Sequence, residues 1–328
     1  MAPKPLFVFS LPRSGSTLLQ RILAYHPDIA TVSETWILLP LAYTLKSSGI
    51  FAEYNPLSQF RALEALYGEL PGGKKDYHKA IKAFADTIYA KLSGNESRYF
   101  LDKTPRYYLI LDEIADIFED SKMIFLFRHP LAVLSSMIQS FNGGRLGDYR
   151  HHIDAVEGPH LLAAGYRKYG NSAIAVQYED MVSRPDDTIQ RLCGYLEIEY
   201  VPSMVADFNR VQLGGVMGDT IGSKQYNNVE TETREKWKTV FGTVYRRNYA
   251  RRYINALGRS TINTLGYSLD GIRDEIDTIQ PVAKGAFKDL VYQFWGKLMS
   301  VSDMPAFIKK ESDLKKDRLK TRNVHYYK

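Results

Sequence analysis

A short apolar run that leads directly into a Gly/Ser turn and a helix is the feature that most limits the fold of this 328-residue chain. Residues 5–10 have the pattern of a buried strand, residues 10–17 read Ser-Leu-Pro-Arg-Ser-Gly-Ser-Thr, and residues 15–25 have helical periodicity. Such a turn points backbone N–H groups outward at the positive end of the helix dipole. The pattern predicts an anion site. The alternative is an ordinary turn in which Ser14 or Ser16 caps the helix.

Further apolar runs at residues 98–102, 122–127 and 172–178 have the pattern of buried strands, and helical patterns follow at 131–141 and 185–196. Short apolar runs that alternate with helices are typical of a parallel sheet covered on both faces. Ligands of such sheets bind where strands end and helices begin. We therefore expect an α/β domain over residues 1–270, with a helical insertion at 46–95. A basic, helical C-terminal extension is expected over 271–328.

The net positive charge of the chain comes from this extension. The sequence has 43 Lys and Arg against 37 Asp and Glu, a net charge of +6. Residues 284–328 contain 11 basic and 5 acidic residues, whereas the first 283 residues contain 32 of each. A generally basic surface of the kind that binds nucleic acid is therefore not indicated. We expect no nucleic-acid partner.

The sequence also limits the expected location. Cys193 is the single cysteine, so no internal disulfide can form. The first residues do not have the pattern of a secretory signal. The longest apolar run, residues 36–45, is interrupted by Pro40 and is too short to span a bilayer. These features predict a cytoplasmic protein.

The Gly/Ser turn differs from the loop that binds nucleoside triphosphates. In the register G-x-x-x-x-G-K-[ST], Gly15 and Thr17 match, but Ser10 and Ser16 stand where the first glycine and the lysine belong. That lysine serves the β- and γ-phosphates of ATP. Here a cation lies inside the loop instead, at Arg13. The turn is suited to an anion but not to ordinary ATP–Mg²⁺ chemistry.

A second candidate site follows the run at 122–127. An arginine at the end of a strand, Arg128, projects into the ligand crevice, where its fork can bind a phosphate through paired hydrogen bonds. Ser136 lies eight residues later in the following helix and can add a hydroxyl. The alternative, a surface arginine and an unrelated helix serine, is equally consistent with these two residues alone.

Several blocks together carry a resemblance to a known family. They are Pro12–Leu19, His26–Asp28, Ser33–Thr35, Asp102–Pro105, Phe127–Pro130 with Ser136, Tyr178–Asp180, Gly218-Asp219 and Lys236-Trp237. With these blocks in this order across about residues 5–240, the chain resembles the PAPS-dependent sulfotransferases, particularly the tyrosylprotein and bacterial enzymes. The resemblance implies a P-loop-like parallel α/β fold.

The resemblance also implies the donor, 3′-phosphoadenosine 5′-phosphosulfate, and the residues that hold it. Backbone N–H groups and hydroxyls of residues 14–17 would bind the 5′-phosphate, Arg128 and Ser136 the 3′-phosphate, and Tyr178 would lie near the adenosine. A segment from about Ile221 to Glu230 would close over the nucleotide. The implied donor-binding residues are Arg13, Ser14, Gly15, Ser16, Thr17, Arg128, Ser136, Tyr178, Ser223 and Lys236.

Three residues are the candidates for catalysis. Negative charge builds on the bridging oxygen during sulfonate transfer, and Arg13 and Lys103 are the cations expected beside it. Glu34 matches the catalytic glutamate of the tyrosylprotein group and would act as the general base. Alternatively, Ser33-Glu34-Thr35 forms a helix cap, or a histidine of the pair His151-His152 is the base. The mechanism requires no metal, and the sequence shows no spacing of metal ligands.

The acceptor is expected to be a hydroxyl of a glycan, a glycolipid or a small metabolite. The insertion at 46–95 is the expected acceptor side, where Tyr43, Tyr54, Tyr67 and Tyr77 line a pocket or simply pack between helices. Two other functions stay open. One is a P-loop kinase that phosphorylates a small metabolite with ATP, and the other is a non-catalytic nucleotide-binding or membrane-associated adaptor.

The extension contains an apolar series at helical spacing. Its members are Phe287, Leu290, Val291, Phe294, Trp295 and Leu298, with Lys284, Lys288 and Lys297 near them. This pattern fits an interfacial helix held by anionic lipid. It also fits a helix packed on its own domain or on a second subunit, which is the commoner arrangement. We therefore expect residues 284–328 to make either a peripheral membrane contact or a subunit contact.

Overall fold

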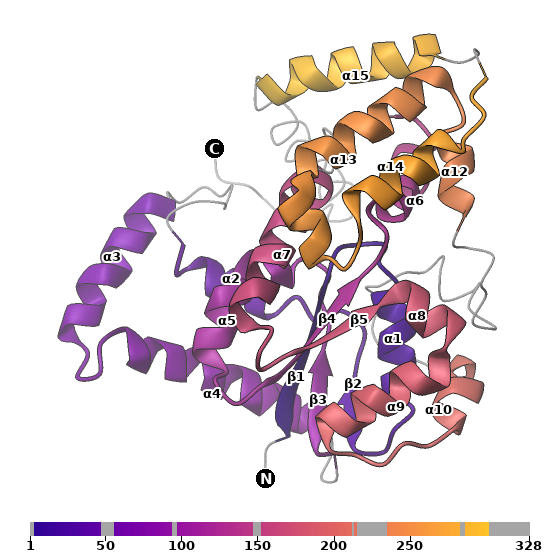
Figure 1. The fold of residues 1–328 in the computed structure, drawn as a ribbon. Coiled ribbons are helices and arrows are strands. Elements are labelled where there is room, and N and C mark those ends of the chain that lie inside the picture. The colour runs from indigo at the N-terminus through magenta and orange to yellow at the C-terminus, as the bar shows by residue number, and fades with distance from the viewer. Residues whose placement is uncertain are drawn as a thin grey trace, which may run out of the picture.

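A five-stranded parallel sheet forms the centre of the protein (Figure 1). The computed structural model describes residues 3–46, 56–93, 97–146, 152–211, 213–214, 235–282 and 286–301. The strands are β1 (Lys4–Ser10), β2 (Ile29–Thr31), β3 (Tyr99–Asp102), β4 (Lys122–Phe127) and β5 (Ile174–Gln177). Their order across the sheet is β2-β3-β1-β4-β5, and every neighbouring pair is parallel.

The register places all carboxyl ends at one edge of the sheet. Phe7 of β1 lies opposite Asp102, the last residue of β3, and Ser10 lies opposite Leu126 of β4. Because the strands are parallel, the loops that follow them all open on this edge, where open α/β sheets bind their ligands.

Alternation along the strands produces a core on each face of the sheet. In β1, Phe7 and Phe9 belong to one buried cluster, whereas Leu6 and Val8 belong to the other. The second cluster is covered by α1 (Ser16–Leu23), α8 (Tyr178–Ser183), α9 (Pro185–Leu196), α10 (Ser203–Ala206) and the turn η3 (Phe208–Arg210).

The first cluster is the larger, and most of the remaining described helices contribute to it. These helices are α2 (Leu38–Tyr43), α4 (Lys74–Ser93), η1 (Tyr107–Ile110), α5 (Leu111–Ile117), α6 (Pro130–Asn142), the π-helix η2 (Ile153–Glu157), α7 (Gly158–Tyr169), α12 (Lys236–Val240), α13 (Val244–Thr264) and α14 (Leu269–Asp277). Two others lie at the periphery, α3 (Pro56–Glu69) at the left and α15 (Ala286–Val301) at the top of Figure 1.

The predicted fold class, an α/β protein with a parallel sheet flanked by helices on both faces, is confirmed. The expected run 122–127 coincides with β4, and the helix expected at 185–196 coincides with α9. The short strand β2 was not expected, because three residues carry no readable periodicity. The helices α3 and α4 fill most of the described part of the 46–95 insertion.

The C-terminal region does not leave the core at residue 270. Helix α14 begins at Leu269, and its residues Ile272 and Ile276 are buried in the larger cluster. This helix therefore packs as part of the α/β body. The helix described after α14 is α15. Residues 302–328 lie outside the described part of the chain.

Candidate active site

Each strand of the sheet ends next to one of the candidate residues. In spatial order across the edge, Glu34 follows β2, Lys103 follows β3, the loop with Arg13 follows β1, Arg128 follows β4 and Tyr178 follows β5. Residues that are far apart in sequence are thereby placed in a row. Two of the three expected catalytic residues, Glu34 and Lys103, lie on one side of the loop that carries Arg13, and the two expected nucleotide contacts, Arg128 and Tyr178, lie on the other.

The loop after β1 has a backbone shape that ordinary turns lack. Gly15 is the N-cap residue of α1 with φ 89°, and α1 has no side-chain cap in the described structure. Arg13 also has positive φ, at 71°. Left-handed residues alternating with right-handed ones turn successive N–H groups toward one concave side, which binds anions. The capping alternative for Ser14 and Ser16 is therefore not what the structure shows.

A cluster around Arg128 holds this loop in place. The Arg128 guanidinium donates through Nη1 to the carbonyl oxygen of Arg13 at 2.9 Å. Its carbon lies 4.1 Å from the centre of the Tyr178 ring, a cation–π contact. The Arg13 side chain donates from Nε to Ser136 Oγ at 3.1 Å. The structure thus brings together Arg13, Arg128, Ser136 and Tyr178, all expected at the donor site.

Gly15 lies directly on the ring of Tyr178. A Cβ atom at this position would come within 2.4 Å of the ring carbon Cδ2. Glycine is therefore required here for two reasons: the positive φ and the close approach of the aromatic ring. The loop and the start of α8 are fitted to each other at this contact.

Two buried polar atoms beside the loop have no hydrogen-bond partner among the described residues. They are Arg128 Nε and Ser10 Oγ, at the ends of the adjacent strands β4 and β1. Leaving a buried donor unsatisfied costs about 1–3 kcal/mol, more for a charged group. An anionic ligand in the crevice would supply the missing acceptor for Arg128. These residues therefore fit a phosphorylated ligand.

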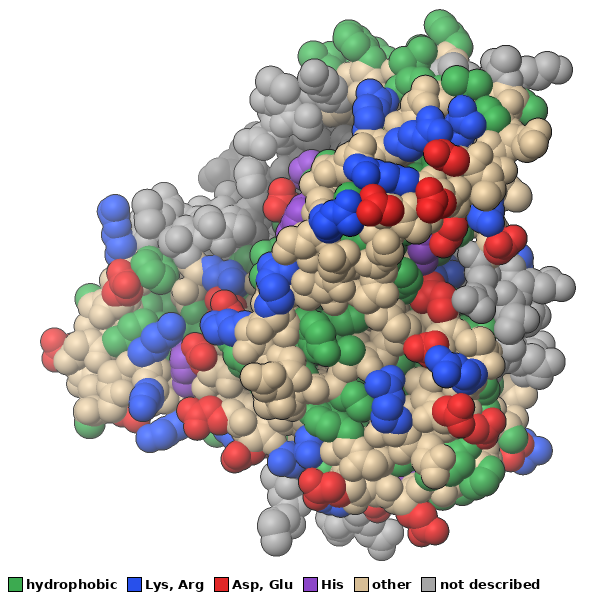
Figure 2. Space-filling view, in the orientation of Figure 1, with side chains coloured by type: hydrophobic (Ala, Val, Ile, Leu, Met, Phe, Trp, Pro, Cys, Tyr) green, Lys and Arg blue, Asp and Glu red, His purple; other side chains and the backbone are tan. Residues whose placement is uncertain are grey.

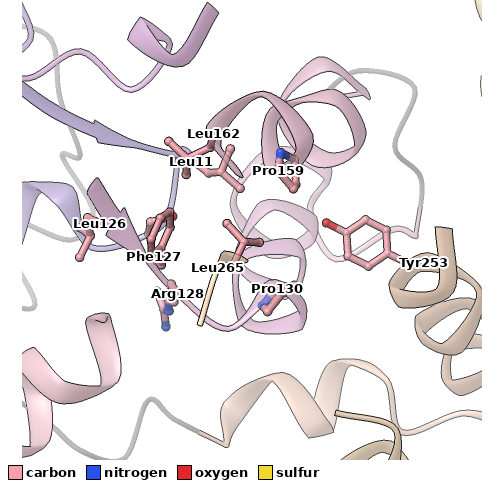
Figure 3. Close-up of a pocket in the computed structure, with 10 residues that line it drawn as sticks. Leu11, Leu126, Phe127, Arg128, Pro130, Pro159, Leu162, Tyr253 and Leu265 are labelled. Carbon is pink, nitrogen blue, oxygen red and sulfur yellow. The ribbon is translucent and has the colours of Figure 1, made fainter. Parts of the chain in front are cut away.

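A small pocket lies behind the loop and is lined mostly by apolar side chains (Figure 3). Leu11, Phe127, Leu162 and Leu265 contribute to its wall, with Arg128 at its edge. Ser14 of the loop also lines it. The pocket therefore adjoins both the loop and the guanidinium that are expected to bind the donor.

Glu34 and Lys103 form a buried ion pair on the other side of the loop. Lys103 Nζ donates to Glu34 Oε1 at 2.8 Å, and the side chains are only 1% and 10% exposed. The indole of Trp36 donates to the second oxygen, Oε2, at 3.2 Å. Trp36 has positive φ, 57°, which is strained for an aromatic residue. Glu34 is therefore a fixed carboxylate and not part of a helix cap.

A fully buried carboxylate, Asp102, supports this pair, and sequence reasoning gave it no role. Its oxygens accept hydrogen bonds from Tyr89 Oη at 2.6 Å, Tyr107 Oη at 2.9 Å and Thr35 Oγ1 at 2.8 Å. Burial raises the pKa of Asp102, while these donors act in the opposite direction. Since Thr35 follows Glu34 and Lys103 follows Asp102, the network fixes both chain segments that carry the ion pair.

The comparison with known proteins agrees with this geometry. A sequence profile described as the sulfotransferase family matches residues 5–202, which is more than half of the chain. The chain belongs to the sulfotransferase family. The matched span includes the five strands, except Lys4 at the start of β1, and both clusters at the edge of the sheet.

Two relatives align with this chain over most of the chain's length. The nodulation protein NoeE of Sinorhizobium fredii is 28% identical over 269 residues, covering 73% of this chain and 61% of NoeE. A putative protein-tyrosine sulfotransferase of Caenorhabditis briggsae is 24% identical over 273 residues, covering 78% of this chain and 89% of that protein. The alignment thus spans less than two thirds of NoeE.

Solved sulfotransferases also match in structure. The sulfotransferase domain from the curacin biosynthetic pathway superposes with a TM-score of 0.47 at 19% identity, covering 73% of this chain and 92% of that domain. The mouse sulfotransferase SULT7A1 complexed with PAP superposes with a TM-score of 0.45 at 13% identity, covering 83% and 90%.

The remaining donor-site candidates of this sulfotransferase-family chain are placed as follows. Ser14 and Ser16 are buried in the loop and Thr17 is half-buried. Lys236 is exposed at the start of α12 and touches none of the loop residues named above in any described hydrogen bond or ion pair. Ser223 and the segment 221–230 lie outside the described residues, so their expected roles stay predictions.

The neighbour of Lys236 has a clear structural role. Trp237 stacks on His129, the residue after Arg128, with ring centres 4.9 Å apart and an angle of 19°. Burial, together with the positive charges of Arg128 and Lys238, lowers the pKa of His129 to about 3. A carboxylate oxygen of Glu275 lies 3.6 Å from its Nε2. Since the ring is neutral at ordinary pH, this contact is not an ion pair.

The other described histidine and tyrosine candidates make no described contact with the loop, Arg128, Glu34 or Lys103. His152 is exposed at the start of η2, and His151 lies outside the described residues. Tyr67 and Tyr77 pack on each other with ring centres 5.6 Å apart, which is the packing alternative. Tyr54 lies outside the described residues.

The described ranges contain no group of three or more His, Cys, Asp or Glu side chains that could hold a metal ion. That the reaction requires no metal stays a prediction.

Proposed function

We propose that this protein transfers a sulfonate group from 3′-phosphoadenosine 5′-phosphosulfate to a hydroxyl of an acceptor. The observation that carries the proposal is the environment of Arg128. Its guanidinium donates to the carbonyl oxygen of Arg13 in the loop after β1, and its buried Nε has no partner among the described residues. An arginine so placed is preorganised for a second phosphate beside the one that the loop would bind. Membership of the sulfotransferase family supports this assignment.

The proposed donor site uses both clusters. The backbone N–H groups and hydroxyls of Ser14, Gly15, Ser16 and Thr17 hold the 5′-phosphate at the start of α1. Arg128 and Ser136 hold the 3′-phosphate, and the Tyr178 ring lies against the adenosine. Ser223 and Lys236 are proposed to contact the nucleotide from the segment that precedes and begins α12.

The proposed chemistry uses Glu34, Lys103 and Arg13. The bound donor supplies an activated sulfonate. Glu34 accepts the proton of the acceptor hydroxyl, because a carboxylate has free lone pairs beyond those used by Lys103 and Trp36. Lys103 and Arg13 place positive charge where the leaving phosphate oxygen gains negative charge. Glu34 and Lys103 are already fixed by their ion pair and by Trp36, so little reorganisation of this pair is needed during reaction.

The proposed acceptor is a hydroxyl of a glycan, a glycolipid or a small metabolite, approached from the side of α3 and α4. Relatives named as protein-tyrosine sulfotransferases make a tyrosine hydroxyl a further acceptor to test. We place the reaction in the cytoplasm. Sheet order supports the approach from this side, since Glu34 follows the edge strand β2 and lies beyond the loop.

The kinase alternative is not favoured. The residue before Thr17 is Ser16, where an ATP-binding loop carries its lysine. The adaptor alternative leaves the buried pair Glu34–Lys103 without a reason, since replacing a buried ion pair by apolar residues is often neutral or stabilising.

The test measures ligand binding first and transfer second. Adenosine 3′,5′-bisphosphate is expected to raise the melting temperature more than AMP, and ATP with Mg²⁺ is expected to have little effect. Donor consumption is then followed with a panel of glycan, glycolipid, small-alcohol and tyrosine-peptide acceptors. A protein that adenosine 3′,5′-bisphosphate neither binds nor stabilises would refute the proposal.

A further inference from the structure

The polar side of helix α15 faces the protein. Asp289 is buried and accepts two hydrogen bonds from Arg246 of α13, at 2.6 Å on Oδ2 and 2.8 Å on Oδ1. Its Oδ1 also accepts from the backbone N–H of Leu146 at 3.2 Å. One turn later, Gln293 accepts from Tyr245 Oη at 2.5 Å. These contacts fix the rotation of α15 about its axis.

The opposite side of α15 is apolar and exposed. Phe294 is 68% exposed and Trp295 is 53% exposed. Phe287, Leu290, Val291 and Leu298 are exposed as well, at the spacing that gathers side chains on one face of a helix. Figure 2 shows hydrophobic side chains along the edge of the molecule that α15 forms in Figure 1.

This orientation is the reverse of the usual one. A helix on the surface of a soluble protein directs its apolar stripe at the core and its polar side at water. Here the buried ion pair with Arg246 holds the helix with its apolar stripe outward. Contiguous exposed apolar surface of this kind marks a site that binds a protein or a membrane.

The charged residues near the apolar stripe of α15 favour a membrane over a protein as the partner. Lys288 is exposed on α15, and the whole positive excess of the chain lies in residues 284–328. Figure 2 shows further Lys and Arg side chains next to this edge, over α13, with Asp and Glu side chains among them. Aromatic and aliphatic side chains bordered by Lys and Arg are the composition of helices that lie in an anionic lipid interface.

We propose that α15 binds the surface of an anionic membrane, with its apolar stripe in the headgroup region and its axis parallel to the bilayer. The helix has 16 residues, whereas spanning a bilayer takes about 20 apolar residues. No helix within the described ranges has the length and apolar content needed to cross a membrane. The contact is therefore peripheral. This proposal does not depend on the proposed reaction.

A second copy of the chain is a less suitable occupant of the stripe. A twofold dimer would place the same face of each subunit against the other. The exposed Lys288 of each copy would then border the same interface, and like charges placed opposite one another there are unfavourable. An anionic surface instead attracts both the helix and the basic residues that follow it in the sequence.

The test is flotation of the full-length protein with vesicles of phosphatidylcholine alone and with vesicles that also contain phosphatidylglycerol. The wild type is expected to float only with the second kind and to be released as the salt concentration rises. The double variant Phe294→Ser/Trp295→Ser is expected to lose at least about tenfold in binding. Lys288→Glu is expected to lose about fivefold.

Phe84→Ser is the matched control, because Phe84 is 48% exposed on α4, far from α15 in Figure 1. It is expected to bind like the wild type, and melting curves check that each variant is folded. Equal binding of Phe294→Ser/Trp295→Ser and the wild type would overturn the proposal, as would equal binding to both vesicle types. The proposal is also wrong if neither the wild type nor any variant binds vesicles. If light scattering then shows a dimeric wild type and a monomeric double variant, the stripe is a subunit interface.

Discussion

Lys103 Nζ lies 2.8 Å from Glu34 Oε1 in a pair that joins the ends of β3 and β2 across the sheet edge. The pair is buried, so neither side chain is free to move to the surface. A buried pair is weak support for stability, because desolvation offsets most of the attraction. Its position at the edge where open α/β sheets bind ligands, together with the Trp36 hydrogen bond to the same carboxylate, supports the proposed role in catalysis.

Replacing Glu34 by Gln tests that role. Gln keeps the size and the hydrogen-bond acceptor for Lys103 but cannot take up the acceptor proton. Turnover is expected to fall at least about a hundredfold, while affinity for adenosine 3′,5′-bisphosphate stays nearly unchanged. Glu113→Gln is the control, because Glu113 is also ion-paired, with Lys46 at 2.7 Å. Transfer at a rate close to wild type in Glu34→Gln would remove Glu34 as the base.

Arg128→Ala tests the assignment of the 3′-phosphate. Affinity is expected to fall by at least about tenfold for adenosine 3′,5′-bisphosphate and much less for AMP, because a charge-assisted fork contributes about 1.5–3 kcal/mol. Calorimetry measures both. Arg247→Ala is the control: like Arg128, it donates through Nη1 to a backbone carbonyl and has a buried Nε without a described partner. An equal loss for both ligands would mean that Arg128 only holds the loop.

Gly15→Ala tests the fit between the loop and Tyr178. The added Cβ would lie 2.4 Å from Cδ2 of the Tyr178 ring, and the alanine would have to adopt the positive φ of 89°. Gly143→Ala shares the positive φ, 58°, but meets nothing within 4 Å. The control is expected to lose about 1 kcal/mol of stability, and Gly15→Ala at least about 1 kcal/mol more from overpacking. Urea denaturation compares them. Equal losses would show that the ring yields to the added methyl group.

Much of the geometry of the candidate site could be predicted because its signals are local. The Gly/Ser turn between a strand and a helix indicated the anion loop, and Arg128 stood at the end of a strand with clear apolar character. Glu34 came from the family resemblance. In each case a short segment contained both the residue and its structural context.

The supporting residues could not be predicted because their partners come from distant segments. Asp102 looks like any strand-end aspartate until Tyr89 of α4 and Thr35 converge on it. Similarly, Arg13 Nε reaches Ser136, which lies 123 residues away. Such pairs depend on sheet order, and neither periodicity nor composition specifies which strands become neighbours.

The stacked ring of His129 makes stability depend on pH. Its pKa is about 3 in the folded protein, against about 6.5 in an unfolded chain. Below about pH 6.5 the unfolded chain therefore binds a proton that the folded protein does not. The free energy of unfolding is expected to fall by up to about 1.4 kcal/mol per pH unit from about pH 6.5 toward pH 3. Above that range this group contributes no pH dependence.

His129→Phe isolates this effect, because Phe can still pack on Trp237 but does not titrate. Urea denaturation at about pH 7 and about pH 5.5 is expected to show a smaller loss on acidification in the variant than in the wild type, by up to about 1.4 kcal/mol. His78→Phe is the control. Burial also lowers the pKa of His78, but this ring is only half-buried, so a smaller change is expected. If wild type and His129→Phe lose stability equally, the folded protein accepts the proton, and His129 is not held neutral by its surroundings.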